Sequence, residues 1–305
     1  MTGLTSTPDA PQGFDLRALL RSVPPPADDD GEQAPRRRVT LLEPDGPRPV
    51  NADPLPVTTA LDGVQGTYLL TRREHRSIWL VWWAAGAVGV TPSREGGRGL
   101  RESLGLVCSY QDEQFCRSLP GGFPCVAVLG EHDPAEIDAK ALEIVQSGRA
   151  EAEASLAREL PLRPDDILVV DGSIAHLQPR PPGCGRVVGL VKTTRAAWLQ
   201  DEPAEISTEA EHRSAIFRIE GRNRTDSTRF STYLRMHSVG PTAPWTSGLV
   251  RLEAHDPDLL DGLCAWTLRQ RQPSNTGDRR WRRHAAAIRL VEETLRARRP
   301  AVFDF

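Results

Sequence analysis

The chain has 305 residues, of which 39% are hydrophobic and 26% charged, and its net charge at pH 7 is −3. This length suits two domains, or one large domain with extensions. The near balance of 38 basic and 41 acidic side chains excludes binding to nucleic acid by overall charge, so a polyanion site must be a local patch. The five cysteines are scattered and never spaced C-x-x-C, which argues against a disulfide framework and a structural zinc site.

No segment has the pattern of a membrane or secretory element. The longest apolar run, residues 78–90, is far shorter than the roughly 20 residues that a membrane span needs. The N-terminus has neither the basic nor the apolar region of a secretory signal. We therefore expect a cytoplasmic protein with no membrane partner.

Residues 1–50 are predicted to form an N-terminal extension, and residues 51–305 the main domain. The extension is rich in Pro, Asp and Arg, a composition typical of a disordered linker. Within it, residues 14–23 (FDLRALLRSV) have the leucine spacing of a short amphipathic helix. This helix could dock on its own domain or on a partner, or be a frayed terminus.

From residue 57 the sequence predicts a β-rich beginning. Residues 57–63 (VTTALDG) are expected to form a strand that ends at an acidic turn. Residues 67–73 (TYLLTRR) and 77–88 (SIWLVWWAAGAV) are expected to follow as an antiparallel hairpin or meander. Further strands are expected at 104–110 and 124–130. An Asp-Pro pair then supplies an N-cap and a first-turn proline, which predict a long helix over 133–160.

After this helix, residues 165–174 (DDILVVDGSI) and 186–194 (RVVGLVKTT) have the continuous apolar runs of strands buried on both faces. More strands are expected at 215–222, 229–236 and 247–254, and closing helices at 259–269 and 281–298. A crossover helix makes the later strands parallel to the first. This order predicts an α/β fold: a ribonuclease H-like mixed sheet flanked by helices, with extra C-terminal strands and helices.

Two of the expected strands end in the same dipeptide, Asp62-Gly63 and Asp171-Gly172. If these strands are parallel and adjacent, both carboxylates lie in the crevice where open α/β sheets bind ligands. Paired carboxylates suit Mg²⁺ or Mn²⁺, and two such ions can hold the attacking and leaving oxygens of a phosphodiester. Asp-Gly is also ordinary turn chemistry, so the dipeptides alone leave both interpretations open.

Several segments resemble motifs of the NurA nuclease family, ribonuclease H-like nucleases of DNA end resection. LVVDGSI with VGLVKTT resembles the family's core, ALDGVQGTYLL its first acidic motif, STYLRM with GLVRLE its later strand block, and GDRRWRRHAAAIRLVEETLR its C-terminal helix. The resemblance covers about residues 57–298. It implies a metal-dependent deoxyribonuclease that cuts single strands or DNA ends with Mn²⁺ or Mg²⁺, as two ions. The first motif departs from the family in reading DGVQ instead of DGS.

The resemblance implies three metal-binding carboxylates. Asp62 and Asp171 match the family's two metal-binding aspartates. The family also has a glutamate on the helix before the second aspartate strand, and Glu153 fits this position best. Glu151 is a rival two residues away, on a different face of the helix. The alternative for Glu153 is a solvated charge on an exposed helix face.

Two further residues are implied to be catalytic. Lys192, one of only two lysines in the chain, matches the family's lysine after the next strand and would contact a phosphate. His284 stands at the late active-site position, as a metal ligand or proton shuttle. The alternatives are an ordinary cation at a strand end and a surface histidine in a basic helix start.

DNA contacts are expected from two places. Tyr233 and Arg235 point the same way on a late strand, and the resemblance suggests that they face a DNA channel. Core Tyr and rim Arg are the competing interpretation. Arg280 and Trp281 combine positive charge with a stacking aromatic ring, which suits single-stranded DNA, although helix packing would also place a Trp there.

Partners follow from the resemblance alone. Members of the family form dimers around a DNA channel and work with a hexameric HerA-type ATPase, in DNA repair or phage defence. A homodimer and this ATPase are therefore expected partners. The chain has no G-x-x-x-x-G-K-[ST] motif with which to hydrolyse ATP itself. Two rival functions remain: a non-catalytic ribonuclease H-like adaptor that binds DNA or the ATPase, and a nucleotide-processing phosphohydrolase.

Overall fold

The computed structural model describes residues 40–44, 46–91, 96–129, 134–177, 186–192, 199, 206–207, 209–220, 228–240, 246–271 and 285–301. The expected N-terminal helix at residues 14–23 lies outside this part of the chain. Among the helices it contains, none is long and apolar enough to cross a membrane.

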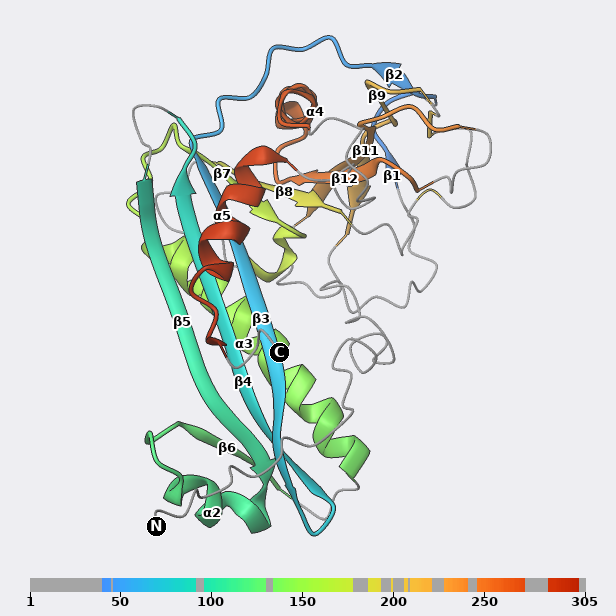
Figure 1. Ribbon diagram of the computed structural model, residues 1–305. Helices are drawn as coiled ribbons and strands as arrows, with labels where there is room; N and C mark the ends of the chain where they lie inside the picture. Colours follow the sequence, from blue (N-terminus) through green and yellow to red (C-terminus); the bar gives the residue numbers. More distant parts are fainter. Residues whose placement is uncertain are drawn as a thin grey trace, which may run out of the picture.

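A mixed sheet of twelve strands organises the protein (Figure 1). Its central strands lie in the order β5-β4-β3-β7-β8. They are β3 (Thr59–Arg73), β4 (Arg76–Gly89), β5 (Gly96–Ser109), β7 (Ile167–Asp171) and β8 (Arg186–Val191). β3, β4 and β5 form an antiparallel meander, whereas β7 is parallel to both β3 and β8. This arrangement is the ribonuclease H-like sheet, so the predicted fold class is confirmed.

The other strands extend both edges of the sheet. Beyond β8 lie β12 (Leu249–Ala254), β11 (Arg229–Arg235) and β10 (Phe217–Ile219), all antiparallel to their neighbours. The short strands on that side are β1 (Thr40–Leu41), β2 (Arg48–Pro49) and β9 (His212–Arg213). Because β1 pairs with β10 and β2 pairs with β9, Thr40–Leu41 and Arg48–Pro49 are part of the sheet. At the opposite edge, β6 (Cys125–Val128) runs parallel to β5.

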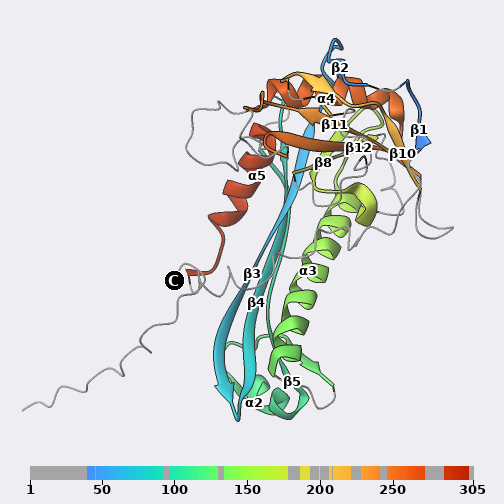
Figure 2. The same ribbon diagram turned by 90° about the vertical axis from the view of Figure 1, so that its right-hand side faces the viewer.

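Helices cover both faces of the central strands (Figure 2). α3 (Pro134–Glu159) packs on one face, where its Ala154 and Leu156 join Leu61 and Leu168 of the sheet. α4 (Leu260–Arg269) and α5 (Ala286–Arg296) pack on the other face, in the core that contains Ala60. α3 begins at Pro134, as the sequence predicts, because a proline at the first helical position gives up a hydrogen bond that the helix does not use.

β3 and β4 form a long hairpin that continues beyond β7 and, together with β5, makes an arm of the sheet. Glu74 and His75 make its two-residue turn with φ of 47° and 71°, the left-handed conformation that such tight hairpins need. The turn lies where the sequence predicts it, but β3 does not end at Asp62-Gly63. Pairing with β4 carries β3 through both residues, opposite Gly86 and Ala85. The short helix α2 (Glu113–Ser118) and β6 lie at the far end of this arm (Figure 1).

Candidate functional site

The two predicted aspartates lie side by side where β3 and β7 separate. Parallel pairing of the two strands ends at Leu61 and Val170, and Asp62 and Asp171 are the next residues on each strand. Strand alternation places Asp62 on the face of Ala60, the face that α5 covers. Asp62 is only 4% exposed, and its Oδ1 accepts a hydrogen bond of 2.7 Å from the Gly63 N–H.

Lys192 joins this pair from the next strand. It directly follows β8, and its Nζ donates a hydrogen bond of 2.6 Å to Asp171 Oδ2. Burial disfavours the ammonium, but the charges of Asp171 and Asp62 outweigh this effect and raise the pKa of Lys192 above its ordinary value. Lys192 is therefore a charged ammonium beside the carboxylates, as a phosphate contact requires.

The field at Asp62 is strongly negative. Burial, and then the charge of Asp171, raise the pKa of Asp62 well above its ordinary value, and Glu153 and Glu292 act in the same direction. Lys192 is the cation that opposes them. Carboxylates that repel one another in a buried position are the arrangement that a bound divalent cation stabilises.

Glu153 approaches from α3 on the opposite face of the sheet. It is 1% exposed, and its Oε2 lies 2.9 Å from His176 Nε2, while its Oε1 lies 3.7 Å from Arg149 Nε. A Cβ on Gly63 would overlap Glu153 Oε1, so the missing side chain lets this carboxylate reach β3. The rival Glu151 is exposed and pairs with Arg158, 3.1 Å away. Of the two glutamates, Glu153 is therefore the buried one, and its charge acts on Asp62 from the other face of the sheet.

The three carboxylates fit a hard divalent cation in chemistry. All are oxygen donors, the ligand type that Mg²⁺ and Mn²⁺ prefer, and Glu153 Oε1 is buried without a hydrogen bond in the described structure. Their oxygen atoms do not all lie within 4.8 Å of one another; in the described chain, the sulfur atoms of three cysteines elsewhere do. Instead Asp171 is held by Lys192, and Glu153 lies against His176.

Sequence reasoning missed Glu292 and His176. Glu292 lies on α5 one turn beyond the buried Ile288, is 19% exposed, and has its Oε1 2.5 Å from Arg296. In the sequence, a glutamate in an amphipathic helix cannot be told from one on the solvent-exposed face. Only the fold shows that Glu292 lies near buried residues. His176 lies on the short 3-10 helix Ile174–Leu177, directly after the Asp171 turn. Because His176 follows Asp171 so closely in the sequence, it could have been proposed as a neighbour of the site.

A buried ionic network fixes the turn after Asp171. Glu253 on β12 accepts hydrogen bonds from Ser173 Oγ at 2.8 Å and from the Ile174 N–H at 3.1 Å. Arg229 and Arg251 lie 3.2 and 3.0 Å from its carboxylate. Burial opposes ionisation of Glu253, but the two arginines prevail and lower its pKa. The network therefore holds the backbone that follows Asp171 in place.

The structure corrects the expectation that Tyr233 and Arg235 face DNA. Tyr233 is 1% exposed and packs on Phe217, with ring centroids 5.8 Å apart. Arg235 is 2% exposed and donates hydrogen bonds to the Ser207 and Ser247 carbonyls at 2.8 and 2.6 Å. The physical reason is that both faces of β11 are covered: Tyr233 lies in a small core with Phe217 and Leu249, and the two carbonyls hold the Arg235 guanidinium inside the protein.

The remaining predicted residues lie outside the described part of the chain. They are Arg280, Trp281 and His284.

Comparison with known proteins gives remote structural likenesses only. No protein-family model and no curated protein matches the sequence. The NurA nuclease from Sulfolobus solfataricus is 10% identical, with 82% of this chain and 81% of that chain covered and a TM-score of 0.48. Endonuclease V from Bacillus subtilis is 12% identical, with 81% and 86% covered and a TM-score of 0.34. Human endonuclease V is 14% identical, with 79% and 84% covered and a TM-score of 0.32. The fold assignment accordingly rests on the strand order of this chain.

Proposed function

We propose that the protein is a metal-dependent DNA nuclease. The observation that carries the proposal is the adjacency of Asp62 and Asp171 where β3 and β7 separate. Ligands of open α/β sheets bind where neighbouring strands diverge at their carboxyl ends. Charge at this point is unbalanced towards acid, because the charges of Asp171, Glu153 and Glu292 all act on Asp62, with Lys192 as the opposing cation. A divalent cation removes that imbalance.

Asp62, Asp171 and Glu153 are the residues that would hold Mn²⁺ or Mg²⁺. When bound, such ions supply an activated water and stabilise the charge that develops in phosphodiester hydrolysis. Lys192 has two roles in this proposal. It balances the charge of Asp171, and it offers a cation to a substrate phosphate. His176 orients Glu153, and His284 is the proposed late active-site residue.

The substrate and partners in this proposal come from the sequence motifs. The resemblance to the NurA family supports DNA ends or single strands as substrate, a homodimer as the working form, and a HerA-type ATPase as partner. A nuclease of this kind would act in DNA repair or phage defence.

The proposal is tested with end-labelled single- and double-stranded DNA. Wild-type protein, Asp171→Asn and the matched control Glu151→Gln are incubated with Mn²⁺ or with EDTA, with and without a HerA-type ATPase. Wild type and the control should cut with Mn²⁺ alone or with the ATPase. Asp171→Asn should lose at least about 100-fold in rate, because a metal ligand stabilises the transition state by several kcal/mol.

Two results would contradict the proposal. Cutting by Asp171→Asn at the wild-type rate would show that the reaction occurs elsewhere. DNA binding without cutting under every condition, by folded wild-type protein, would favour the adaptor function.

A further inference from the structure

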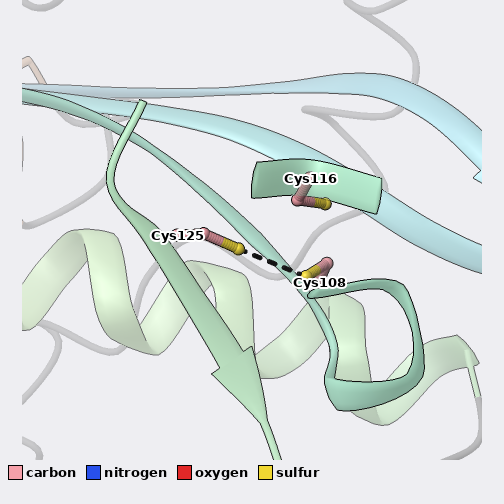
Figure 3. Close-up of side chains that lie close together, drawn as sticks. All are labelled: Cys108, Cys116 and Cys125. Carbon is pink, nitrogen blue, oxygen red and sulfur yellow. Dashed lines mark hydrogen bonds between the residues drawn. The ribbon is translucent and has the colours of Figure 1, made fainter. Parts of the chain in front are cut away.

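Three cysteines that are scattered in the sequence meet at the far end of the arm. Cys108 lies near the end of β5, Cys116 in α2 and Cys125 at the start of β6. Figure 3 shows the three side chains close together, with each on a different element. Their Sγ atoms all lie within 4.8 Å of one another, and those of Cys108 and Cys125 are 3.5 Å apart.

This cluster is separate from the carboxylate site. In the register of the sheet, Val107 lies opposite Trp79, which in turn pairs with Leu69 of β3. Leu69 is seven residues beyond Asp62 along the same strand, or about 23 Å at about 3.3 Å per residue. A ligand at the cysteines therefore does not touch the candidate nuclease residues.

The spacing of the sulfur atoms is close to that of a metal–thiolate site. Zinc–sulfur bonds of about 2.3 Å in tetrahedral geometry place sulfur atoms about 3.8 Å apart. The observed limit of 4.8 Å is thus within about 1 Å of a coordinating arrangement. Cys108 and Cys116 are buried, while Cys125 is partly exposed, which leaves one side of the cluster accessible to solvent.

We propose that Cys108, Cys116 and Cys125 bind one soft d¹⁰ metal ion, Zn²⁺, through three thiolates, with a water molecule as the fourth ligand. Thiolates select zinc over the hard ions that carboxylates bind, so this site and the carboxylate site would take different metals. Asp112 is no fourth ligand, because Arg76 Nε lies 2.8 Å from its Oδ2 and Arg73 lies 3.5 Å from its Oδ1.

The ion would join two short elements, α2 and β6, to the long strand β5. α2 has six residues and β6 has four, and β6 is the edge strand of the sheet. A metal that bridges them to β5 would fix the end of the arm, much as structural zinc stabilises small domains.

Simple packing and oxidation are the competing explanations. Buried cysteines often serve as small apolar residues, but that role does not require three sulfur atoms in one place. Cys108 and Cys116 are buried, which limits the access of oxidants to their thiols. A bound cation favours the thiolate form that a metal–sulfur bond needs.

The test uses the full-length protein, stripped of metal under reducing conditions and titrated with Cd²⁺ as an optical probe for thiolates. We expect one Cd²⁺ per chain with an ultraviolet thiolate charge-transfer band, and a weaker apparent Cd²⁺ affinity in excess Zn²⁺ but not in excess Mn²⁺. Removal of an outer-shell partner of a metal already costs about 10–100-fold in affinity. Loss of a direct ligand in Cys125→Ser or Cys116→Ser should therefore cost at least about 100-fold.

Controls separate the site from general effects. Cys264→Ala removes a buried cysteine in α4 outside the cluster, and Asp171→Asn alters the carboxylate site; both should keep the band. Because Cys125 is partly exposed, its serine variant should fold, and circular dichroism checks this. The proposal is wrong if wild type shows no band, if folded Cys125→Ser binds Cd²⁺ as wild type does, or if mass spectrometry finds a Cys108–Cys125 disulfide in its place.

Discussion

Gly63→Ala is predicted to lower DNA cleavage strongly while the protein stays folded. A Cβ at this position would overlap Glu153 Oε1 and lie 2.8 Å from Arg149 Cγ and 2.9 Å from Glu153 Cδ. These are side-chain atoms of α3, so they move aside at a cost typical of an overpacked core, about 1–3 kcal/mol of unfolding free energy. Glu153 is then displaced from the aspartates. A misplacement of about 1 Å at a reacting centre can lower a rate about 100-fold.

Gly99→Ala is the matched control, because it makes the same change against the same helix. Its Cβ would lie 2.6 Å from Leu156 Cδ1, a side-chain atom in the apolar cluster under α3. Denaturant unfolding and Mn²⁺-dependent cleavage of single-stranded DNA are measured for both variants. Both should lose similar stability, and only Gly63→Ala should lose cleavage. Equal cleavage by two equally destabilised variants would refute the role assigned to Glu153.

Four further predictions concern the buried charges, the metal and the N-terminal segment. Because its pKa is raised, Asp62 contributes stability below its ordinary pKa, and this contribution is lost as pH rises through the pKa of the folded protein. Asp62→Asn should therefore melt at a higher temperature than wild type at neutral pH in EDTA, and should lose cleavage when Mn²⁺ is present. A lower melting temperature of the folded variant would show that the carboxylate is not repelled. The lowered pKa of Glu253 contributes stability above its ordinary pKa that is lost as pH falls, so Glu253→Gln should cost about 3–5 kcal/mol at neutral pH and flatten the acid side of the stability profile; an unchanged profile would contradict the network. Ca²⁺ should support DNA binding without cleavage, because its longer and looser coordination misplaces the attacking water, and full activity in excess EDTA after metal removal would exclude the proposed mechanism. Deletion of residues 1–35 should abolish co-elution with a HerA-type ATPase and leave cleavage of single-stranded DNA intact, and the reverse outcome would assign the segment to the nuclease.

The sequence predicts those parts of the fold and site that depend on local pattern. The long helix shows its proline start, and β7 and β8 show the apolar runs of buried parallel strands. Asp171 ends its strand as expected, and Gly172 takes φ +118°, a conformation that favours glycine. The order of these elements was sufficient to place Asp62 beside Asp171.

What the sequence does not predict depends on contacts between distant segments. β3 continues past Asp62 because β4 pairs with it there, and an Asp-Gly turn signal carries no information about that pairing. Tyr233 is enclosed by side chains of β10 and β12, and Arg235 by the carbonyls of Ser207 and Ser247. Glu292 comes to Asp62 from a helix more than 200 residues later in the chain.

The cysteines illustrate the same limit. Their spacing of eight and nine residues matches no short metal-binding motif. They meet only because β5, α2 and β6 fold back on one another at the end of the arm. Spacing along the chain argues against a structural zinc site, but in the fold the three sulfur atoms lie within 4.8 Å of one another.

The central claim is that Asp62, Asp171 and Glu153 hold the metal at which DNA is cut, and anomalous diffraction from crystals grown with Mn²⁺ tests it most directly. We predict an anomalous peak within bonding distance of the Asp62 and Asp171 carboxylates, with the Glu153 carboxylate turned towards it. The peak should be absent in Asp171→Asn. An empty site with Lys192 still bonded to Asp171, in protein that cuts DNA in the same Mn²⁺ buffer, would contradict it.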